Sequence, residues 1–205
     1  MTDSQARWIQ AMIHLKSYFD QHEANPENSV RWAKVHDEVC LWLSDFGTTG
    51  KILDAGCRRG EVRRSSLFPA SLQYFGIDPL KVDGFEYPFD FRCETLESTS
   101  FENETFDFVL VKDSVDCFAE PLVAFASAFR ILKRGGRLLI TEDDHSPDRV
   151  IKSKAEASYP NGDLSTTEIS NGCIKAGFRD VNMEIRGCRL FLAATRPKRR
   201  WGLFV

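Results

Sequence analysis

The stretch Ile52-Leu53-Asp54-Ala55-Gly56-Cys57-Arg58-Arg59-Gly60-Glu61 carries the strongest indication of the fold. It begins in a short apolar run, which is typical of a buried strand that feeds a tight turn. Gly56 and Gly60 allow the backbone to approach a ligand closely, and a helix that starts here would offer free N–H groups. Such turns are common, so this stretch alone predicts a ligand-binding turn without naming the ligand.

Short apolar runs alternate with helical patterns along the rest of the chain. Strands are predicted at 51–56, 72–78, 106–113, 137–142, 180–185 and 189–196. Helical spacing of apolar residues is found at 5–23, 30–46, 120–133 and 166–176. This alternation predicts an α/β fold, with a mostly parallel sheet covered on both faces. Only a short turn at Gly187 separates the last two strands, so these should be antiparallel.

The chain is predicted to divide into an N-terminal helical cap at 1–46, one α/β domain at 47–196 and a basic tail at 197–205. A net charge of -3 gives no reason to expect nucleic acid or an anionic membrane as partner. The N-terminus lacks the pattern of a signal peptide and no apolar run is long enough to span a bilayer, so we expect a cytoplasmic protein. The apolar residues of the tail would suit docking on the body or on a partner subunit, and the second option would give a homodimer.

The six cysteines form no Cys-x-x-Cys pair and none has another ligand at zinc spacing. We therefore predict no metal site and expect the cysteines to pack as small apolar residues.

A second candidate ligand-binding residue lies at the end of the second predicted strand. In Phe75-Gly76-Ile77-Asp78, the acid lies 18 residues after Gly60, close to the spacing at which an acid accepts both hydroxyls of a ribose. The alternative is that Asp78 caps a helix or lies in a solvated turn.

Four segments of the sequence, taken in their order along the chain, resemble one protein family. LDAGCRRG, FGIDP, FDFVLVKDSVD and EPLVAFASAFRILKRGGRLLITE are similar in order and spacing to class I S-adenosylmethionine-dependent methyltransferases, over roughly residues 50–145 with a continuation to 196. The resemblance implies a Rossmann-like three-layer sandwich with a seven-stranded, mostly parallel sheet and an antiparallel last strand. It also implies S-adenosylmethionine as cofactor. The residues that it places at the cofactor are Asp54, Gly56, Cys57, Arg58, Gly60, Asp78, Pro79, Glu94 and Lys112.

The sequence departs from the family pattern at two positions. Arg58 stands where the family usually has glycine. Its side chain would point outward, pair with the cofactor carboxylate or block the site. Cys117 takes the place of a histidine that related small-molecule enzymes often carry after the fourth strand. A thiol is a poor general base unless its pKa is lowered, so a packing role is expected for it.

Candidate general bases lie near strand ends that should face the cofactor. They are His145, Asp116 and Asp113, with Asp144 beside them, and for His145 the alternative is a solvated turn residue. The histidines of the helical cap are expected at its surface. Most cap aromatics are expected in the core, with Trp32 and Tyr18 as the exceptions that could line an acceptor pocket.

Almost no separate substrate domain is present, which favours a small-molecule or small-peptide acceptor. The sequence thus predicts a methyltransferase. A relative that binds cofactor or a partner without catalysis is the alternative. A nicotinamide-dependent oxidoreductase is disfavoured, because its loop would read G-x-G-x-x-G.

Overall fold

A computed structural model describes residues 8, 12, 16, 26–143 and 164–198 of the chain. The helices and strands follow one another as α2 (Pro26–Ser44), β1 (Gly50–Ala55), α3 (Glu61–Arg64), β2 (Leu72–Ile77), β3 (Asp90–Arg92), β4 (Phe106–Lys112), α4 (Pro121–Ile131), β5 (Leu132–Asp143), α5 (Thr166–Lys175), β6 (Arg179–Arg186) and β7 (Arg189–Thr195). Two single 3₁₀ turns, η1 (Leu96–Ser98) and η2 (Val115–Cys117), flank β4.

The strands form one seven-stranded sheet in the order β3-β2-β1-β4-β5-β7-β6. Neighbours from β3 to β5 are parallel, and β7 is antiparallel to both β5 and β6. The α/β fold class, the seven-stranded sheet and the antiparallel last strand predicted from the sequence are confirmed. The strand order reverses between β1 and β4, which is where open α/β sheets bind ligands beyond the carboxyl ends of their strands.

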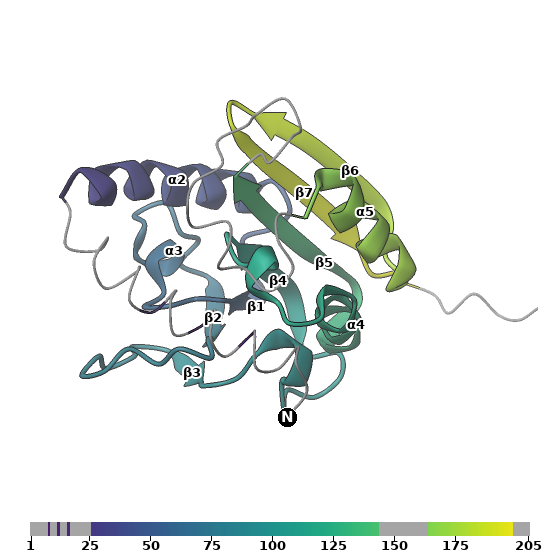
Figure 1. Ribbon diagram of the computed structural model, residues 1–205, viewed down its shortest axis with the longest axis horizontal. Coiled ribbons are helices and arrows are strands. Elements are labelled where there is room, and N and C mark those ends of the chain that lie inside the picture. Colours follow the sequence, from purple (N-terminus) through teal and green to yellow (C-terminus); the bar gives the residue numbers. More distant parts are fainter. Residues whose placement is uncertain (1–7, 9–11, 13–15, 17–25, 144–163, 199–205) are drawn as a thin grey trace, which may run out of the picture.

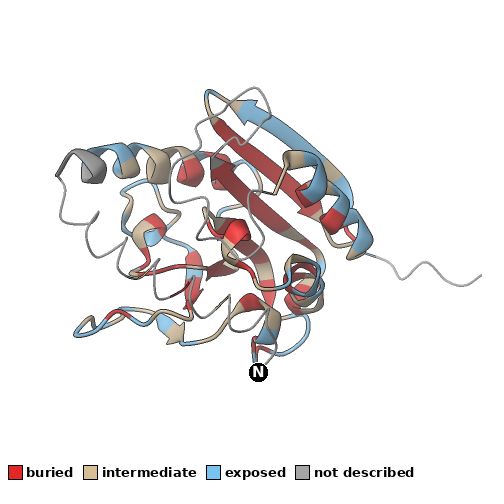
Figure 2. Ribbon diagram, viewed as in Figure 1, coloured by how far each residue is buried: buried red, intermediate tan, exposed pale blue. Residues whose placement is uncertain are grey.

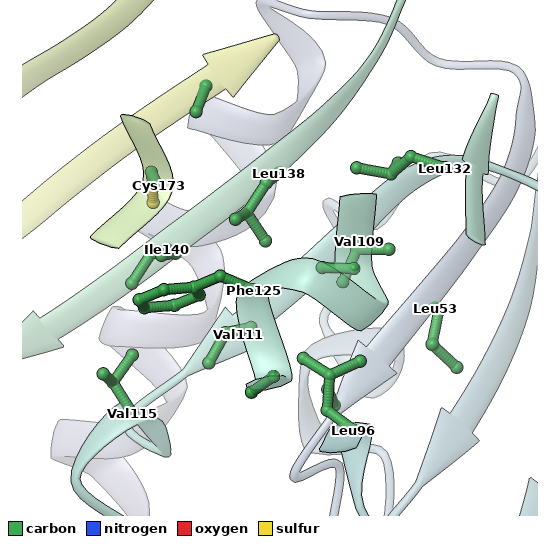
Figure 3. Packing of buried hydrophobic residues seen from close by; sticks show 14 of the residues in the cluster. Leu53, Leu96, Val109, Val111, Val115, Phe125, Leu132, Leu138, Ile140 and Cys173 are labelled. Atoms are coloured by element: carbon green, nitrogen blue, oxygen red, sulfur yellow. The ribbon is translucent and has the colours of Figure 1, made fainter. Parts of the chain in front are cut away.

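Helices cover both faces of the sheet and give three layers (Figure 1). On one face α4 and α5 pack on the apolar side chains of the central strands; Phe125, Val109 and Ile140 lie at the centre of this cluster (Figure 3). On the other face α2 places Val39 and Leu43 against the sheet. Burial follows this arrangement, because the central strands are buried while β6, at the edge of the sheet, is mostly exposed (Figure 2).

Two boundaries and one strand differ from the prediction for local physical reasons. Helix α2 begins at Pro26, not at residue 30, because proline suits the first turn of a helix, where its missing N–H is not needed. The pair Gly135 and Gly136 lies inside β5 instead of before it; Gly135 has a φ of 81°, and the pairing with β4 shifts register between Phe106 and Phe108. The three-residue β3 was not predicted, since it is too short to show a pattern.

The first predicted helix, at 5–23, falls almost entirely outside the described residues. Three of its positions are described, and Trp8 among them donates its indole N–H to the Cys117 carbonyl at 3.0 Å. This contact places Trp8 beside η2, the turn that follows β4. Among the described residues, no helix is long and apolar enough to cross a membrane.

Candidate cofactor and acceptor site

A cavity of about 600 Å³ lies at the carboxyl ends of β1, β2 and β4 and is covered by the N-terminal half of α2. We call it the strand-end cavity. Its volume falls within the range usual for small-molecule sites. Of the residues predicted at the cofactor, all but one line it: Asp54, Gly56, Cys57, Arg58, Asp78, Pro79, Glu94 and Lys112. Gly60 is not among the lining residues; it is the N-cap of α3, with a left-handed φ of 74°.

The turn after β1 is held against β2 by its own backbone. The N–H groups of Gly56 and Cys57 both donate to the Ile77 carbonyl, at 2.9 and 3.1 Å. Gly56 has a φ of 86°, and a Cβ there would lie 2.2 Å from the Ser114 hydroxyl. A side chain at this position would therefore collide with the segment after β4, so glycine is required for close packing as well as for backbone conformation.

Asp54 is the second-last residue of β1 and lines the cavity, where its carboxylate accepts a 2.5 Å hydrogen bond from the Tyr74 hydroxyl. The side chain is buried, and this burial raises its pKa to about 7 despite the hydrogen bond and the nearby Lys112, which both favour the ionised form. The carboxyl group is therefore poised to ionise when a cation binds beside it.

Asp78 anchors the second wall of the cavity at the end of β2. Its carboxylate accepts the Arg58 N–H at 2.9 Å through Oδ2 and the Leu80 N–H at 2.7 Å through Oδ1. The side chain is buried, and burial raises its pKa, against the two N–H groups and the Arg58 charge. A carboxylate oxygen has two lone pairs, so each oxygen keeps one acceptor site for a ligand hydroxyl.

Arg58 adopts a φ of 47°, the left-handed conformation that glycine would take without strain. Its side chain is buried and lines the strand-end cavity. The outward orientation, one of the three alternatives weighed from the sequence, is therefore wrong. The guanidinium charge lies close enough to Asp78 to favour the ionised carboxylate.

Glu94 lines the cavity on the β3 side. Its carboxylate accepts hydrogen bonds from the N–H and hydroxyl of Ser100, at 2.9 and 2.6 Å, and from the Thr99 hydroxyl at 3.2 Å. Burial opposes ionisation, but these bonds outweigh it and hold the pKa of Glu94 below its usual value. The side chain thus fixes the segment that follows β3 as it closes the cavity.

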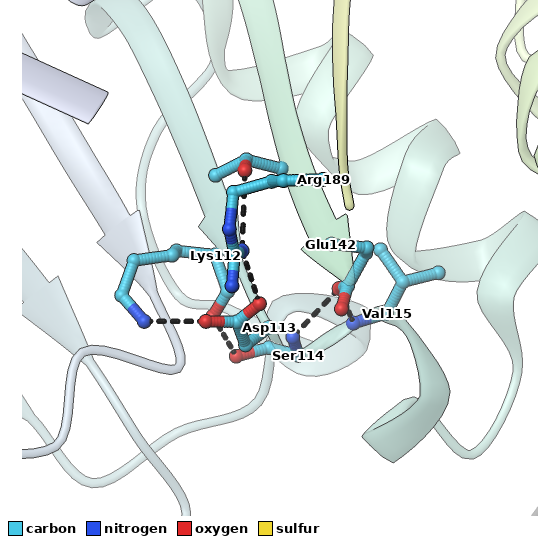
Figure 4. A network of polar contacts seen from close by, with 7 residues as sticks. Lys112, Asp113, Ser114, Val115, Glu142 and Arg189 are labelled. Atoms are coloured by element: carbon cyan, nitrogen blue, oxygen red, sulfur yellow. Dashed lines mark hydrogen bonds and ion pairs between the residues drawn. The ribbon is translucent and has the colours of Figure 1, made fainter. Parts of the chain in front are cut away.

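Charged side chains form a network where β4 ends (Figure 4). Asp113 binds the Lys112 ammonium at 2.6 Å and the Arg189 guanidinium at 2.5 Å. Burial opposes ionisation of Asp113, yet the two cations outweigh it and lower the pKa of the carboxyl group. Beside it, the buried Glu142 accepts the N–H groups of Ser114 and Val115, both at 2.7 Å, and so fixes the turn after β4.

The predicted general bases are placed differently from one another. Asp113 lines the strand-end cavity but shares its oxygens with two cations. Asp116 is buried outside the lining and accepts the Leu164 N–H at 3.3 Å. His145 and Asp144 lie outside the described residues. Cys117 lines the cavity, and burial raises the pKa of its thiol well above its usual value, so the thiol stays neutral.

His36 was missed by sequence reasoning, which placed the histidines of the cap at the surface. It lines the strand-end cavity one helical turn after Trp32. Trp32 was correctly singled out as an exception among the cap aromatics. Residues four apart share a helix face, so the same argument applied to His36 would have found it. Trp8 also lines the cavity, although the sequence favoured a core position for it.

Comparisons with known proteins agree with this geometry. Residues 53–140 match the family model described as a methyltransferase domain. No curated protein is significantly similar to the chain.

Within the described residues, no group of three or more His, Cys, Asp or Glu is arranged to hold a metal ion.

Three solved structures show what the fold is similar to. A possible histamine N-methyltransferase from Thermotoga maritima is 21% identical, with a TM-score of 0.60 over 83% of this chain and 95% of that one. Phosphoethanolamine N-methyltransferase 2 of Haemonchus contortus, solved with phosphomonomethylethanolamine and S-adenosylhomocysteine, is 20% identical, with a TM-score of 0.61 over 78% of this chain and 52% of that one. The [4+2]-cyclase SpnF is 17% identical, with a TM-score of 0.61 over 78% of this chain and 81% of that one.

The residues present in the cavity suit S-adenosylmethionine. Asp78 keeps acceptor sites for hydroxyl groups, and Asp54 is a buried acid that a cation would ionise. Residues 53–140 therefore match a methyltransferase domain, and the chain has the fold of the class I S-adenosylmethionine-dependent methyltransferases.

Proposed function

We propose that this chain transfers the methyl group of S-adenosylmethionine to a small-molecule acceptor that binds in the strand-end cavity. The observation that carries the proposal is that one cavity joins the ends of β1, β2 and β4 and is closed on its far side by α2. The cavity offers cofactor-binding groups on one side and a wall of aromatic and cationic side chains on the other. A partly enclosed space of this size suits a small molecule or a short peptide better than a folded nucleic acid.

We propose that different lining residues bind different parts of the cofactor. Asp78 would accept the ribose hydroxyls, with Pro79 and Glu94 beside the adenine. The turn from Asp54 to Gly60, including Gly56, Cys57 and Arg58, would hold the amino-acid end, with the Asp54 carboxylate next to its amino group. Lys112 would lie near the methyl group. The cofactor supplies a methyl group already activated by the positive charge on sulfur, so the protein mainly has to align the acceptor with it.

Calorimetry with S-adenosylmethionine and with its demethylated product tests the first half of this proposal. We expect both to bind, and Asp78→Asn to weaken both. Mass spectrometry of a metabolite mixture incubated with protein and cofactor tests the second half, through the appearance of a methylated product. Absence of binding by either molecule would contradict the proposal.

A second candidate function has a specific observation in its favour. SpnF, a cyclase, shares this fold, so the fold alone does not establish methyl transfer. A cofactor-binding relative without methyl-transfer activity would bind the cofactor but release no S-adenosylhomocysteine with any acceptor. The same mass-spectrometric experiment separates the two functions.

A further inference from the structure

Strand β6 forms one edge of the seven-stranded sheet. It is the last strand in the sheet order, and among the described residues it pairs with β7 alone. Most of its residues are exposed (Figure 2). An edge strand presents a row of backbone N–H and C=O groups that can pair with a strand of another chain.

The edge carries exposed apolar side chains on one face of the sheet. Met183 and Ile185 are 46% and 52% exposed. They lie opposite Leu192 and Leu190 of β7, which belong to the core cluster beneath α4 and α5. Residues that lie opposite each other share a face, so Met183 and Ile185 continue this apolar layer to the rim of the sheet. Natural edge strands usually carry charges instead, and exposed apolar residues at an edge indicate a site of association.

The other face of β6 carries polar and charged side chains. Asn182 and Glu184 lie opposite Ala193 and Phe191 of β7, on the face that α2 covers. Arg186 binds the Glu184 carboxylate at 2.5 Å, and its guanidinium lies 4.9 Å from the centre of the Phe191 ring. A strand that pairs with β6 must therefore match an apolar face and a charged face at once.

A second copy of β6 that runs antiparallel matches the apolar face. Such a pair has a two-fold axis, so each contact occurs twice. With Met183 on the axis, this residue lies opposite its own copy, and Ile185 lies opposite Val181. The side chain of Val181 packs on the core cluster, so all three residues belong to the same face of the sheet. The register thus places apolar side chains only against apolar ones on this face.

Charge distinguishes this register from its neighbours. With Met183 on the axis, Glu184 lies opposite the neutral Asn182, and Arg186 lies opposite the acidic Asp180. A shift by two residues brings Glu184 opposite its own copy in one direction and opposite Asp180 in the other. Both shifts place like charges directly opposite each other, which destabilises a pair of strands. A shift by one residue places apolar side chains against polar ones.

An irregularity at the start of β6 limits the length of the ladder. Asp180 has a φ of 48°, and the pairing with β7 shifts register between Arg179 and Asn182. Such a bulge interrupts an edge, whereas the rest of β6 pairs regularly with β7. A backbone ladder between two copies would run only from Val181 to Ile185, which gives a small interface and a weak dimer.

We propose that two copies of the chain associate through β6, antiparallel and with Met183 on the two-fold axis, so that their sheets join into one. The axis is perpendicular to the sheet, so α5 of both copies lies on the same face, with the apolar side chains of β6 between them. Backbone hydrogen bonds and burial of these side chains supply the affinity. This surface differs from docking of the apolar tail residues, the route to a homodimer that the sequence suggests.

Sedimentation velocity of the full chain at increasing concentration tests the association. We expect a reversible equilibrium between monomer and dimer with a Kd in the micromolar range. Met183→Lys should weaken the dimer at least about tenfold, because it places two ammonium groups opposite each other on the axis. The matched control is Leu67→Lys, since Leu67 is an apolar residue between α3 and β2 that is 43% exposed.

Circular dichroism checks that both lysine variants are folded. A chain that stays monomeric at every concentration would overturn the inference. So would a dimer that persists in Met183→Lys, or one that Leu67→Lys weakens to the same extent.

Cysteine cross-linking tests the register. Under mild oxidation Met183→Cys should form a disulfide-linked dimer, because opposite residues of an antiparallel pair have Cα atoms about 4.5–5.5 Å apart, within reach of a disulfide. Glu184→Cys is the matched control, since residue 184 lies opposite its own copy only in a shifted register. The unaltered protein shows the background from its native cysteines. No cross-link in Met183→Cys, or an equal or stronger one in Glu184→Cys, would contradict the proposed register.

Discussion

The backbone N–H of Arg58 donates a 2.9 Å hydrogen bond to the carboxylate of Asp78, and this bond ties the turn after β1 to the end of β2. The donor is a backbone group, so the bond survives any change of side chain at position 58. It does require the left-handed backbone that Arg58 adopts, with a φ of 47°. The geometry of the cavity therefore depends on the conformation of this residue more than on its chemistry.

Replacement of Arg58 by glycine and by alanine separates these two contributions. Both variants lose the guanidinium, but only alanine keeps a Cβ that disfavours the left-handed conformation. We expect Arg58→Gly to be more stable than Arg58→Ala by about 1 kcal/mol, as measured by urea denaturation. An alanine variant that matches or exceeds the glycine variant in stability would show that the backbone at this position is not strained.

Asp78→Ala should weaken S-adenosylmethionine binding by more than tenfold, because a hydrogen bond to a charged group contributes about 1.5–3 kcal/mol. Asp78→Asn is the matched variant, since it keeps one oxygen and most of the side-chain volume, and it should lose less affinity. Calorimetry measures both, and circular dichroism checks that each variant is folded. Unchanged affinity in a folded Asp78→Ala variant would remove this residue from the site.

Binding of the cofactor should release a proton from Asp54. The pKa of this carboxyl group is raised to about 7 by burial, so the group carries a proton at lower pH, and a bound ammonium group would favour ionisation. At pH 7 a substantial fraction of the molecules carries this proton, so we expect binding to release a fraction of a proton per molecule. Calorimetry in buffers of different ionisation enthalpy measures this number.

Two variants provide the controls for proton release. Tyr74→Phe removes the hydrogen bond that favours the carboxylate, so the pKa of Asp54 should rise and the release at pH 7 should increase. Asp54→Asn has no proton to give, and a release that persists in this variant would point to another group.

Asp113→Asn should destabilise the protein by about 3 kcal/mol, because it removes the carboxylate that Arg189, which is only 4% exposed, binds at 2.5 Å. The matched control is Asp83→Asn, which breaks the exposed pair with Lys16 and should cost less than about 1 kcal/mol. Urea denaturation at neutral pH measures both losses. Equal losses would show that the buried pair contributes no more than the exposed one.

The pH dependence of this effect has a definite sign. The pKa of Asp113 is lowered in the folded protein, so its ionised form stabilises the fold at pH values above the ordinary pKa of an aspartate, about 4. This stabilisation is lost as pH falls through the folded-state pKa. The difference between Asp113→Asn and the unaltered protein should therefore shrink in acid.

Local patterns in the sequence were sufficient to predict most of the fold. Apolar runs with turn residues at their ends predicted six of the seven strands, and the short turn at Gly187 predicted the antiparallel pair of β6 and β7. Strand β3 was not predicted, because three residues are too few to show a periodic pattern. Pro26 and Gly135 are residue types typical of breaks in structure, but here Pro26 begins α2 and Gly135 lies within β5, where the pairing with β4 shifts register.

The candidate site was predictable where the side chains that could bind a ligand lie at the ends of strands. Asp54 lies near the end of the strand predicted at 51–56 and Asp78 ends the strand predicted at 72–78, so parallel neighbours bring them to one edge of the sheet. The position of His36 in the cavity lining was harder to predict. It depends on how α2 packs over the ends of the strands, which no local pattern in the sequence shows. The predicted role of His145, the cytoplasmic location and a homodimer stay predictions.

The place of β7 in the sheet has a consequence for synthesis of the protein. This strand ends at Thr195, yet it lies between β5 and β6 and pairs with both. A nascent chain that has emerged only as far as β6 therefore still lacks the strand that joins β6 to the rest of the sheet. The central strands can begin to associate earlier, but the sheet closes only when β7 itself has left the ribosome.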